Sequence, residues 1–171
     1  MHPSNTSWIL RGLGLALAGG LAACSSYGPG AAQGEPVQAL MARMGAPEVQ
    51  RVVNGQTRLE YPRGPMGHHT WFITLDAQGR VNQIEQVLTE ARFAQVLPGQ
   101  SAEAVRLHLG RPSEVQGLAR NRGAVWSYRY ESRPFCQWFQ VEFDAQDRVR
   151  STGYGEPPEC STDHDAVFKL F

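Results

Sequence analysis

The residues of this chain that could carry reactive chemistry are three cysteines and a few histidines. His68 and His69 are adjacent, and His164 stands between two aspartates near the C-terminus. A zinc site needs three or four converging ligands, whereas neighbouring side chains on a strand point to opposite faces. The histidine pair is therefore not expected to chelate one ion, and we predict no metal site.

Sequence motifs for nucleotide or hydrolytic chemistry are not found either. The chain has no glycine-rich phosphate loop, no Gly-x-Ser-x-Gly nucleophile elbow and no His-Glu-x-x-His zinc motif. Its acidic residues are scattered, mostly at expected turns. We predict no catalytic residue and no cofactor, and treat a hydrolase or metal enzyme as the weaker alternative.

Cys24 ends a segment with the layout of an export signal. Arg11 supplies a positive charge, residues 12–23 form an apolar run, and the run ends in Leu-Ala-Ala-Cys. The run is too short to span about 30 Å of hydrocarbon as a helix. Its ending resembles the bacterial lipobox, which implies cleavage after residues 1–23 and lipidation of Cys24. The alternative is an ordinary signal peptide with a chance cysteine.

The resemblance to lipoproteins also implies a location. Ser25 follows the anchor, where the lipoprotein rule places Asp in proteins kept in the inner membrane, so we expect an outer-membrane anchor facing the periplasm. Residues 24–34 are rich in Gly, Ser and Pro and are expected to form a flexible tether. The chain has 16 basic and 16 acidic residues, a balance that gives no electrostatic footprint for nucleic acid.

Cys136 and Cys160 are the remaining cysteines. Two leftover thiols in an oxidising compartment most often pair, so we predict a disulfide that ties the C-terminal tail to the preceding unit. A redox-active pair is the alternative, but the spacing is not Cys-x-x-Cys.

The sequence contains an internal repeat. Residues 34–47 align without a gap on residues 99–112 at an offset of 65. Asp-Ala-Gln-Gly-Arg-Val at 76–81 returns as Asp-Ala-Gln-Asp-Arg-Val at 144–149, at an offset of 68. A period of this length indicates two similar small units in tandem rather than a solenoid, which needs at least three copies. We place the first unit at 35–90, the second at 91–155 and a tail at 156–171.

Each unit is expected to be α+β, with one or two short helices packed on a three- or four-stranded antiparallel sheet. A cap residue, an apolar stripe, Gly and then Pro predict helices near 37–44 and 101–109, with a further short helix within 88–97. Period-two alternation predicts strands, which in chain order are 49–53, 56–61, 69–75, 80–87, 115–118, 126–130, 138–143 and 148–154. Units of this size are marginal alone, so we expect the two sheets to lie side by side and present one broad outer face.

A candidate binding surface follows from the strand pattern. If Phe139, Val141 and Phe143 face the core, Trp138 faces outward, and Arg129, Arg148 and Arg150 could stand near it. A Trp ringed by Arg is typical of protein-contact hot spots. The alternative is that the tail folds back and covers Trp138.

The landmarks of the second unit are similar to those of a known family, the BamE-like (SmpA/OmlA) domain of outer-membrane assembly lipoproteins. They are Gly99 before the helix, Val105 within it, Leu109-Gly110-Arg111-Pro112 after it, and the aromatic strand with Trp126 and Tyr128. The first unit keeps Gly34, Val37, Gly45, Pro47 and Tyr61, with Met44 for Leu and Leu59 for Trp. A looser likeness of architecture links the tandem units to the β-lactamase inhibitory protein.

The resemblance implies a non-catalytic, outer-membrane-anchored periplasmic lipoprotein that binds other proteins in outer-membrane protein assembly or envelope maintenance. Its expected partners are assembly or other envelope proteins, with the membrane reached through Cys24 and no nucleic acid bound. The alternative is a periplasmic inhibitor or ligand-binding module that uses the joined sheets as its receptor surface.

Overall fold

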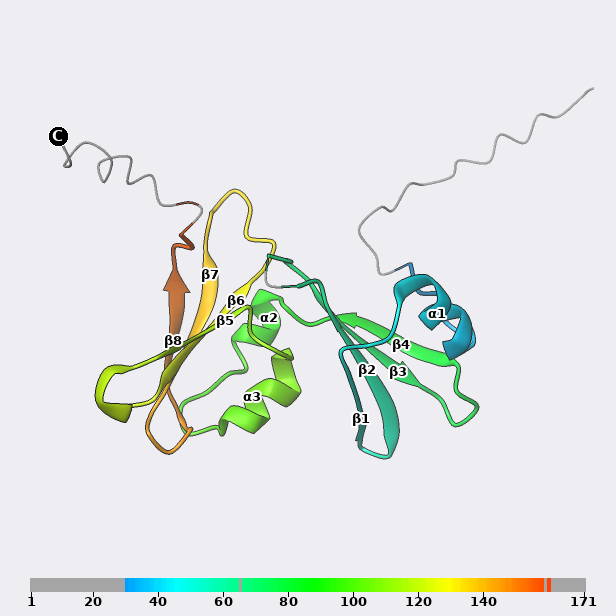
Figure 1. The fold of residues 1–171 in the computed structure, drawn as a ribbon, viewed down its shortest axis with the longest axis horizontal. Coiled ribbons are helices and arrows are strands. Elements are labelled where there is room, and N and C mark those ends of the chain that lie inside the picture. The colour runs from blue at the N-terminus through cyan, green and yellow to red at the C-terminus, as the bar shows by residue number, and fades with distance from the viewer. Residues whose placement is uncertain (1–29, 65, 159, 161–171) are drawn as a thin grey trace, which may run out of the picture.

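The structure, a computed structural model, describes residues 30–64, 66–158 and 160 (Figure 1). Cys24, with the predicted signal and most of the tether, lies outside the described residues, as does His164. The chain is α+β, with two four-stranded antiparallel sheets ordered β1-β2-β3-β4 and β5-β6-β7-β8. The elements are α1 (Val37–Met44), β1 (Val49–Val53), β2 (Gln56–Pro62), β3 (Thr70–Leu75), β4 (Val81–Gln86), α2 (Glu90–Phe93), α3 (Ala102–Leu109), β5 (Glu114–Gly117), the 3-10 turn η1 (Ala119–Asn121), β6 (Ala124–Arg129), β7 (Trp138–Phe143) and β8 (Val149–Gly155).

In the first unit, α1 packs on one face of its sheet. Leu40 of α1 is fully buried and lies in one apolar cluster with Leu59, Ile73 and Val81 of the sheet. The helix ends at Gly45, whose φ of 83° suits a residue without a Cβ. This glycine allows the chain to turn from the helix into β1.

In the second unit, α2 and α3 cover the equivalent face of their sheet. The Ser101 side chain accepts a hydrogen bond from the Ala104 amide and so caps α3, as the sequence predicts. Phe93 of α2 stacks on Phe139 with ring centroids 4.3 Å apart and meets the edge of Tyr130 at 4.9 Å. This aromatic cluster is the centre of the larger core.

The two units repeat one another in strand register. The pair Leu59↔Ile73 of the first sheet corresponds to Trp126↔Val141 of the second, and a register shift occurs at the same place, at Thr74/Leu75 and at Glu142/Phe143. Even an irregularity of the ladder is therefore duplicated.

Single hydrogen bonds are duplicated as well. The hydroxyl of Tyr61 donates to the carbonyl of Gly45 at 3.2 Å, and the hydroxyl of Tyr128 donates to that of Gly110 at 3.3 Å. Both bonds tie the end of a helix to the second strand of its sheet. The sequence repeat thus corresponds to a repeat of fold.

The packing of the two units differs from the expected side-by-side sheets. Phe72, on the face of the first sheet opposite α1, belongs to the core cluster of the second unit, and Arg58 beside it donates to the carbonyl of Leu107 in α3 at 3.0 Å. The second unit's helices therefore lie between the sheets (Figure 1). The expectation of one broad face shared by both sheets is wrong, because the layers follow the order α1, first sheet, α2 and α3, second sheet.

Charged side chains hold this interface between the units. Glu60 is 2% exposed and contacts two arginines, Arg58 at 2.7 Å and Arg51 at 3.0 Å. The guanidinium of Arg58 also lies over the Phe72 ring, 4.0 Å from its centroid. At the exposed edge, Arg111 pairs with Glu48 at 2.9 Å.

The two helix-ending glycines allow a matched test of this interface. A Cβ on Gly45 would meet nothing within 4 Å, whereas one on Gly110 would lie 3.0 Å from Cγ2 of Thr70. We expect Gly45→Ala to lower the free energy of unfolding by about 1–2 kcal/mol, because alanine is strained at positive φ. Gly110→Ala should lower it further, because the added methyl group also pushes the units apart. Urea unfolding of both variants checks this, and equal losses would contradict the close packing of Gly110.

Candidate protein-binding loop and sheet face

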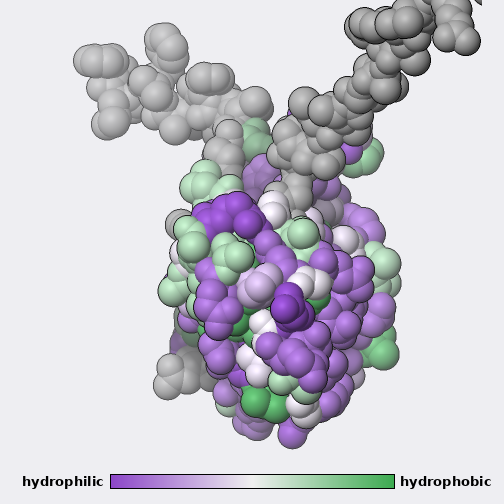
Figure 2. Space-filling view, turned by 90° about the vertical axis from the view of Figure 1, so that its right-hand side faces the viewer, coloured by the Kyte–Doolittle hydropathy of each residue, from purple (hydrophilic) through white to green (hydrophobic). Residues whose placement is uncertain are grey.

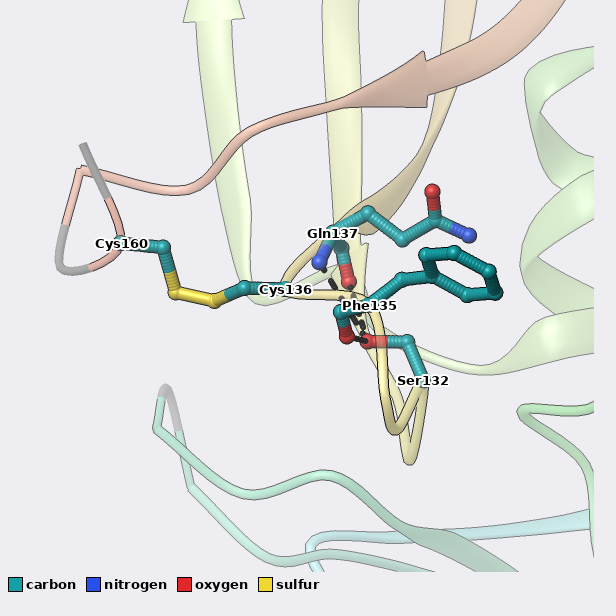
Figure 3. The surroundings of a disulfide bond; sticks show 5 residues. All are labelled: Ser132, Phe135, Cys136, Gln137 and Cys160. Atoms are coloured by element: carbon teal, nitrogen blue, oxygen red, sulfur yellow. Dashed lines mark hydrogen bonds between the residues drawn. A yellow bond between two sulfur atoms is a disulfide. The ribbon is translucent and has the colours of Figure 1, made fainter. Parts of the chain in front are cut away.

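Cys136 and Cys160 are brought together as the sequence predicts. Their Cα atoms are 6.1 Å apart, and Figure 3 shows the two sulfurs joined. Cys136 lies on the loop that connects β6 to β7, and Cys160 lies beyond β8 at the end of the described chain. The bond therefore fastens the segment after β8 to this loop.

The loop at 131–137 is ordered by its own hydrogen bonds. The Ser132 hydroxyl donates to the carbonyl of Phe135 at 2.6 Å and accepts from the amide of Gln137 at 3.3 Å (Figure 3). The amide of Phe135 in turn donates to the carbonyl of Ser132 at 2.8 Å. These bonds close a tight turn with Phe135 in it.

A chain of hydrogen bonds links the loop to the helix layer. The Gln137 side chain donates to the Tyr130 hydroxyl at 2.7 Å, and that hydroxyl donates to the Glu90 carboxylate at 2.6 Å. The Tyr154 hydroxyl donates to the other oxygen of Glu90. Burial, together with the nearby carboxylate, raises the pKa of Tyr130 to about 12, so its proton is retained throughout the neutral range.

Phe135 is presented at the surface of this ordered loop. Its side chain is 67% exposed, the most exposed aromatic ring of the described residues. A hollow of about 360 Å³ adjoins it, walled by the disulfide and by residues that include His68 of the first unit, Tyr130, Pro134 and Pro157. The arrangement is an apolar contact point beside a recess, on a loop fastened by one covalent bond and several hydrogen bonds.

Trp138 faces outward from the second sheet but is not presented to solvent. The residue is only 6% exposed, and the Arg129 guanidinium lies over its ring at 4.9 Å. Its indole nitrogen has no hydrogen-bond partner, and a Cβ on Gly155 of the neighbouring strand would lie 3.0 Å from that nitrogen. The expectation of an exposed indole is therefore not met.

The other two predicted arginines lie elsewhere. Arg150 pairs with Glu142 at 2.9 Å, four residues along β7 from Trp138, which is roughly 13 Å at the usual rise per residue. Arg148 lies 3.5 Å from the carbonyl of Gly99, beside α3. The structure thus brings Arg129 to Trp138 and leaves Arg148 and Arg150 at the far end of the strand.

The face that carries Trp138, called here the outer face, is the side of the second sheet away from α2 and α3. None of the described helices covers it (Figure 1). From the strand register it comprises Glu114 and Gln116 on β5, Val125, Ser127 and Arg129 on β6, Trp138, Gln140 and Glu142 on β7, and Ser151, Gly153 and Gly155 on β8. Most of its side chains are small or neutral, with a shallow hollow of about 170 Å³ in the middle.

The histidine pair lies near the loop rather than in a chelating site. Burial is the main cause that lowers the pKa of His69, and the hydrogen bond from Arg133 is the main cause that lowers the pKa of Glu131. Among the residues that the structure describes, no group of three or more His, Cys, Asp or Glu side chains could hold a metal ion.

Within 30–64, 66–158 and 160, no helix has the length and hydropathy to cross a membrane.

The sequence pattern alone does not single out Phe135. The available signal was its position, with an apolar Pro-Phe pair between Arg133 and Cys136 in an expected turn. What the sequence did not show is that Ser132 closes this turn on itself. The exposed ring therefore emerges only from the fold.

Comparisons with known proteins do not place the chain in a family. No protein-family profile and no curated protein sequence matches it. A solved structure, an extracellular protein containing a SCP domain from Bacillus anthracis, aligns with a TM-score of 0.29 and 13% identity over 72% of this chain. The chain spans 44% of that protein, and a likeness at this level carries no argument about fold or function.

Proposed function

We propose that this chain is a non-catalytic, outer-membrane-anchored periplasmic lipoprotein that binds other envelope proteins, in outer-membrane protein assembly or envelope maintenance. Its two BamE-like units form the scaffold, and the loop at 131–137 supplies the contact. The observation that supports this most is an aromatic side chain, Phe135, held exposed on an ordered loop.

The loop has the physical properties of a protein-contact site. An exposed aromatic ring can bury a large apolar area on binding, and aromatic residues dominate binding energy in many interfaces. Because the Ser132 hydrogen bonds and the disulfide already fix the loop, little conformational entropy is lost on association. The recess beside the ring offers space for a partner side chain.

The anchor at Cys24 gives this contact site a location. Lipidation at that position would hold the units at the periplasmic surface of the outer membrane, and the tether at 24–34 would let them reach neighbouring proteins. Replacing Cys24 with Ala should release the protein from the membrane fraction.

The contact can be tested by in-cell photocrosslinking from position 135. We expect a specific adduct with an envelope protein, and for Phe135→Ala we expect affinity for that protein to fall by roughly 30-fold, the cost of about 2 kcal/mol for losing a hot-spot aromatic. The matched control is Val115→Ala, which truncates another exposed apolar side chain, 56% exposed, in the same unit. Equal effects of the two substitutions, or no adduct, would refute the contact.

A further inference from the structure

We infer that copies of this chain associate head to tail, with the α1 end of one copy packed on the outer face of the next. This interface is separate from the Phe135 contact and does not depend on it. The inference rests on the repeat. The chain contains one complete interface between a sheet and the helix layer of the following unit, and the equivalent sheet and the equivalent helix are both left without such a neighbour among the described residues (Figure 1).

The internal interface identifies which residues would meet. On the sheet side, Arg58 and Phe72 contact the end of α3, and their counterparts from the matching register are Val125 and Gln140. On the helix side, Leu107 and Gly110 receive these contacts, and the repeat offset of 65 gives Ala42 and Gly45 as counterparts. Both counterpart sets lie at the surface: Ala42 and Gly45 are exposed, and Val125 and Gln140 are half-buried.

Two ion pairs of the internal interface are replaced by uncharged residues at the equivalent positions of both counterpart surfaces. Arg51 and Glu103 form an ion pair in the internal interface, and the equivalent residues are Gln116 on the second sheet and Gln38 on α1. The pair of Glu48 with Arg111 becomes Ser113 facing Ala46. Docking the two ends would therefore bury no unpaired charge from these four positions, and a buried unpaired charge is the usual obstacle to a new protein contact. Two carboxylates remain on the outer face: Glu142, which pairs with Arg150, and Glu114 on β5, at the edge of the sheet.

The end that α1 presents is consistent with a weak, concentration-dependent association. Figure 2 shows that side of the molecule, and outside the grey residues its surface is mostly hydrophilic with scattered apolar groups. A contact between one surface and a different one does not close on itself as a two-fold pair does. We therefore expect a mixture of monomers, dimers and larger linear oligomers whose average size grows as the concentration rises.

Two charge variants of the full chain test the pairing. Gln140→Arg blocks the sheet end, and Ala42→Glu blocks the helix end, so each variant alone should associate at least about tenfold more weakly than the unmodified chain. An equimolar mixture should associate again. The introduced arginine then lies beside the introduced glutamate, because their counterparts Phe72 and Leu107 both contact Arg58, and the two other ends are unchanged. Sedimentation velocity at increasing concentration measures this, and Val115→Arg on the helix-facing side of β5 is the control that should change nothing.

The outcomes separate this inference from its rivals. A chain that stays monomeric at all concentrations overturns it, as does association lost in Gln140→Arg but unaffected by Ala42→Glu, which would mean sheet-to-sheet pairing. Circular dichroism confirms that each variant is folded. Phe135→Ala should leave the head-to-tail self-association unchanged. Failure of the envelope contact and failure of the head-to-tail contact can therefore be distinguished.

Discussion

Replacing Glu60 with alanine is expected to lower the free energy of unfolding by about 3–5 kcal/mol, the usual cost of removing one partner from a buried ion pair. Glu60 is 2% exposed and is the carboxylate that neutralises Arg58, itself 9% exposed at the interface between the units. Without it, the Arg58 guanidinium keeps only the Leu107 carbonyl and the Phe72 ring as favourable contacts. Urea unfolding followed by tryptophan fluorescence measures the loss.

Two comparisons show whether the cause is the stranded charge. Glu103→Ala removes the exposed end of the same network, where the side chain is 65% exposed, and should cost less than about 1 kcal/mol. The double variant Arg58→Met with Glu60→Leu should recover much of the stability, since an apolar pair of similar size leaves no unpaired charge. If the double variant is as unstable as Glu60→Ala, the loss arises from packing instead.

The sequence repeat predicts the elements well because each rests on a local signal. The Gly at the end of α1 and of α3, the Ser101 cap and the alternating strands all act within a few residues. The shared offsets of 65 and 68 then transfer these signals from one unit to the other. Element bounds therefore agree with the structure to within about two residues, the usual ambiguity of element ends.

The stacking of the units could not be predicted in the same way, because its signal is spread over distant residues. Arg58 and Glu60 alternate with Leu59 and so resemble an ordinary solvent-facing strand pattern. Only the fold shows that α3 covers them and that Phe72, which fits either face of a strand, joins the other unit's core. A charged residue beneath a neighbouring unit has the same sequence pattern as one in water.

The candidate site was predicted in part, and for a related reason. The Cys136–Cys160 pairing could be predicted because these are the two cysteines that remain besides Cys24, and the outward direction of Trp138 could be predicted from strand alternation. The burial of Trp138 could not be predicted, because its neighbours Gly155 and Arg129 lie on other strands. Strand alternation alone does not determine the register of those strands. Arg148 and Arg150 were grouped with Trp138 only because the strand order was unknown.

Replacing both Cys136 and Cys160 with serine is expected to lower the free energy of unfolding by about 3 kcal/mol. The cross-link spans a sequence separation of 24 residues, and in the chain-entropy description a loop of that size restricts the unfolded chain by about this amount. The double variant avoids a lone thiol. Unfolding in urea, with and without a reductant, measures the loss, and a reductant should destabilise only the unmodified protein. Mass spectrometry of the non-reduced protein should first show the two cysteines joined.

The same variant separates the stability of the unit from the presentation of Phe135. The Ser132 turn and the Gln137–Tyr130–Glu90 chain remain when the disulfide is gone, so the ring should stay close to its present position. Crosslinking from position 135 should then fall only a few-fold below the unmodified level, far less than the affinity loss of roughly 30-fold expected for Phe135→Ala. A full loss of the adduct in a folded double-serine variant would mean that the disulfide, and not the hydrogen-bonded turn, holds the contact in place.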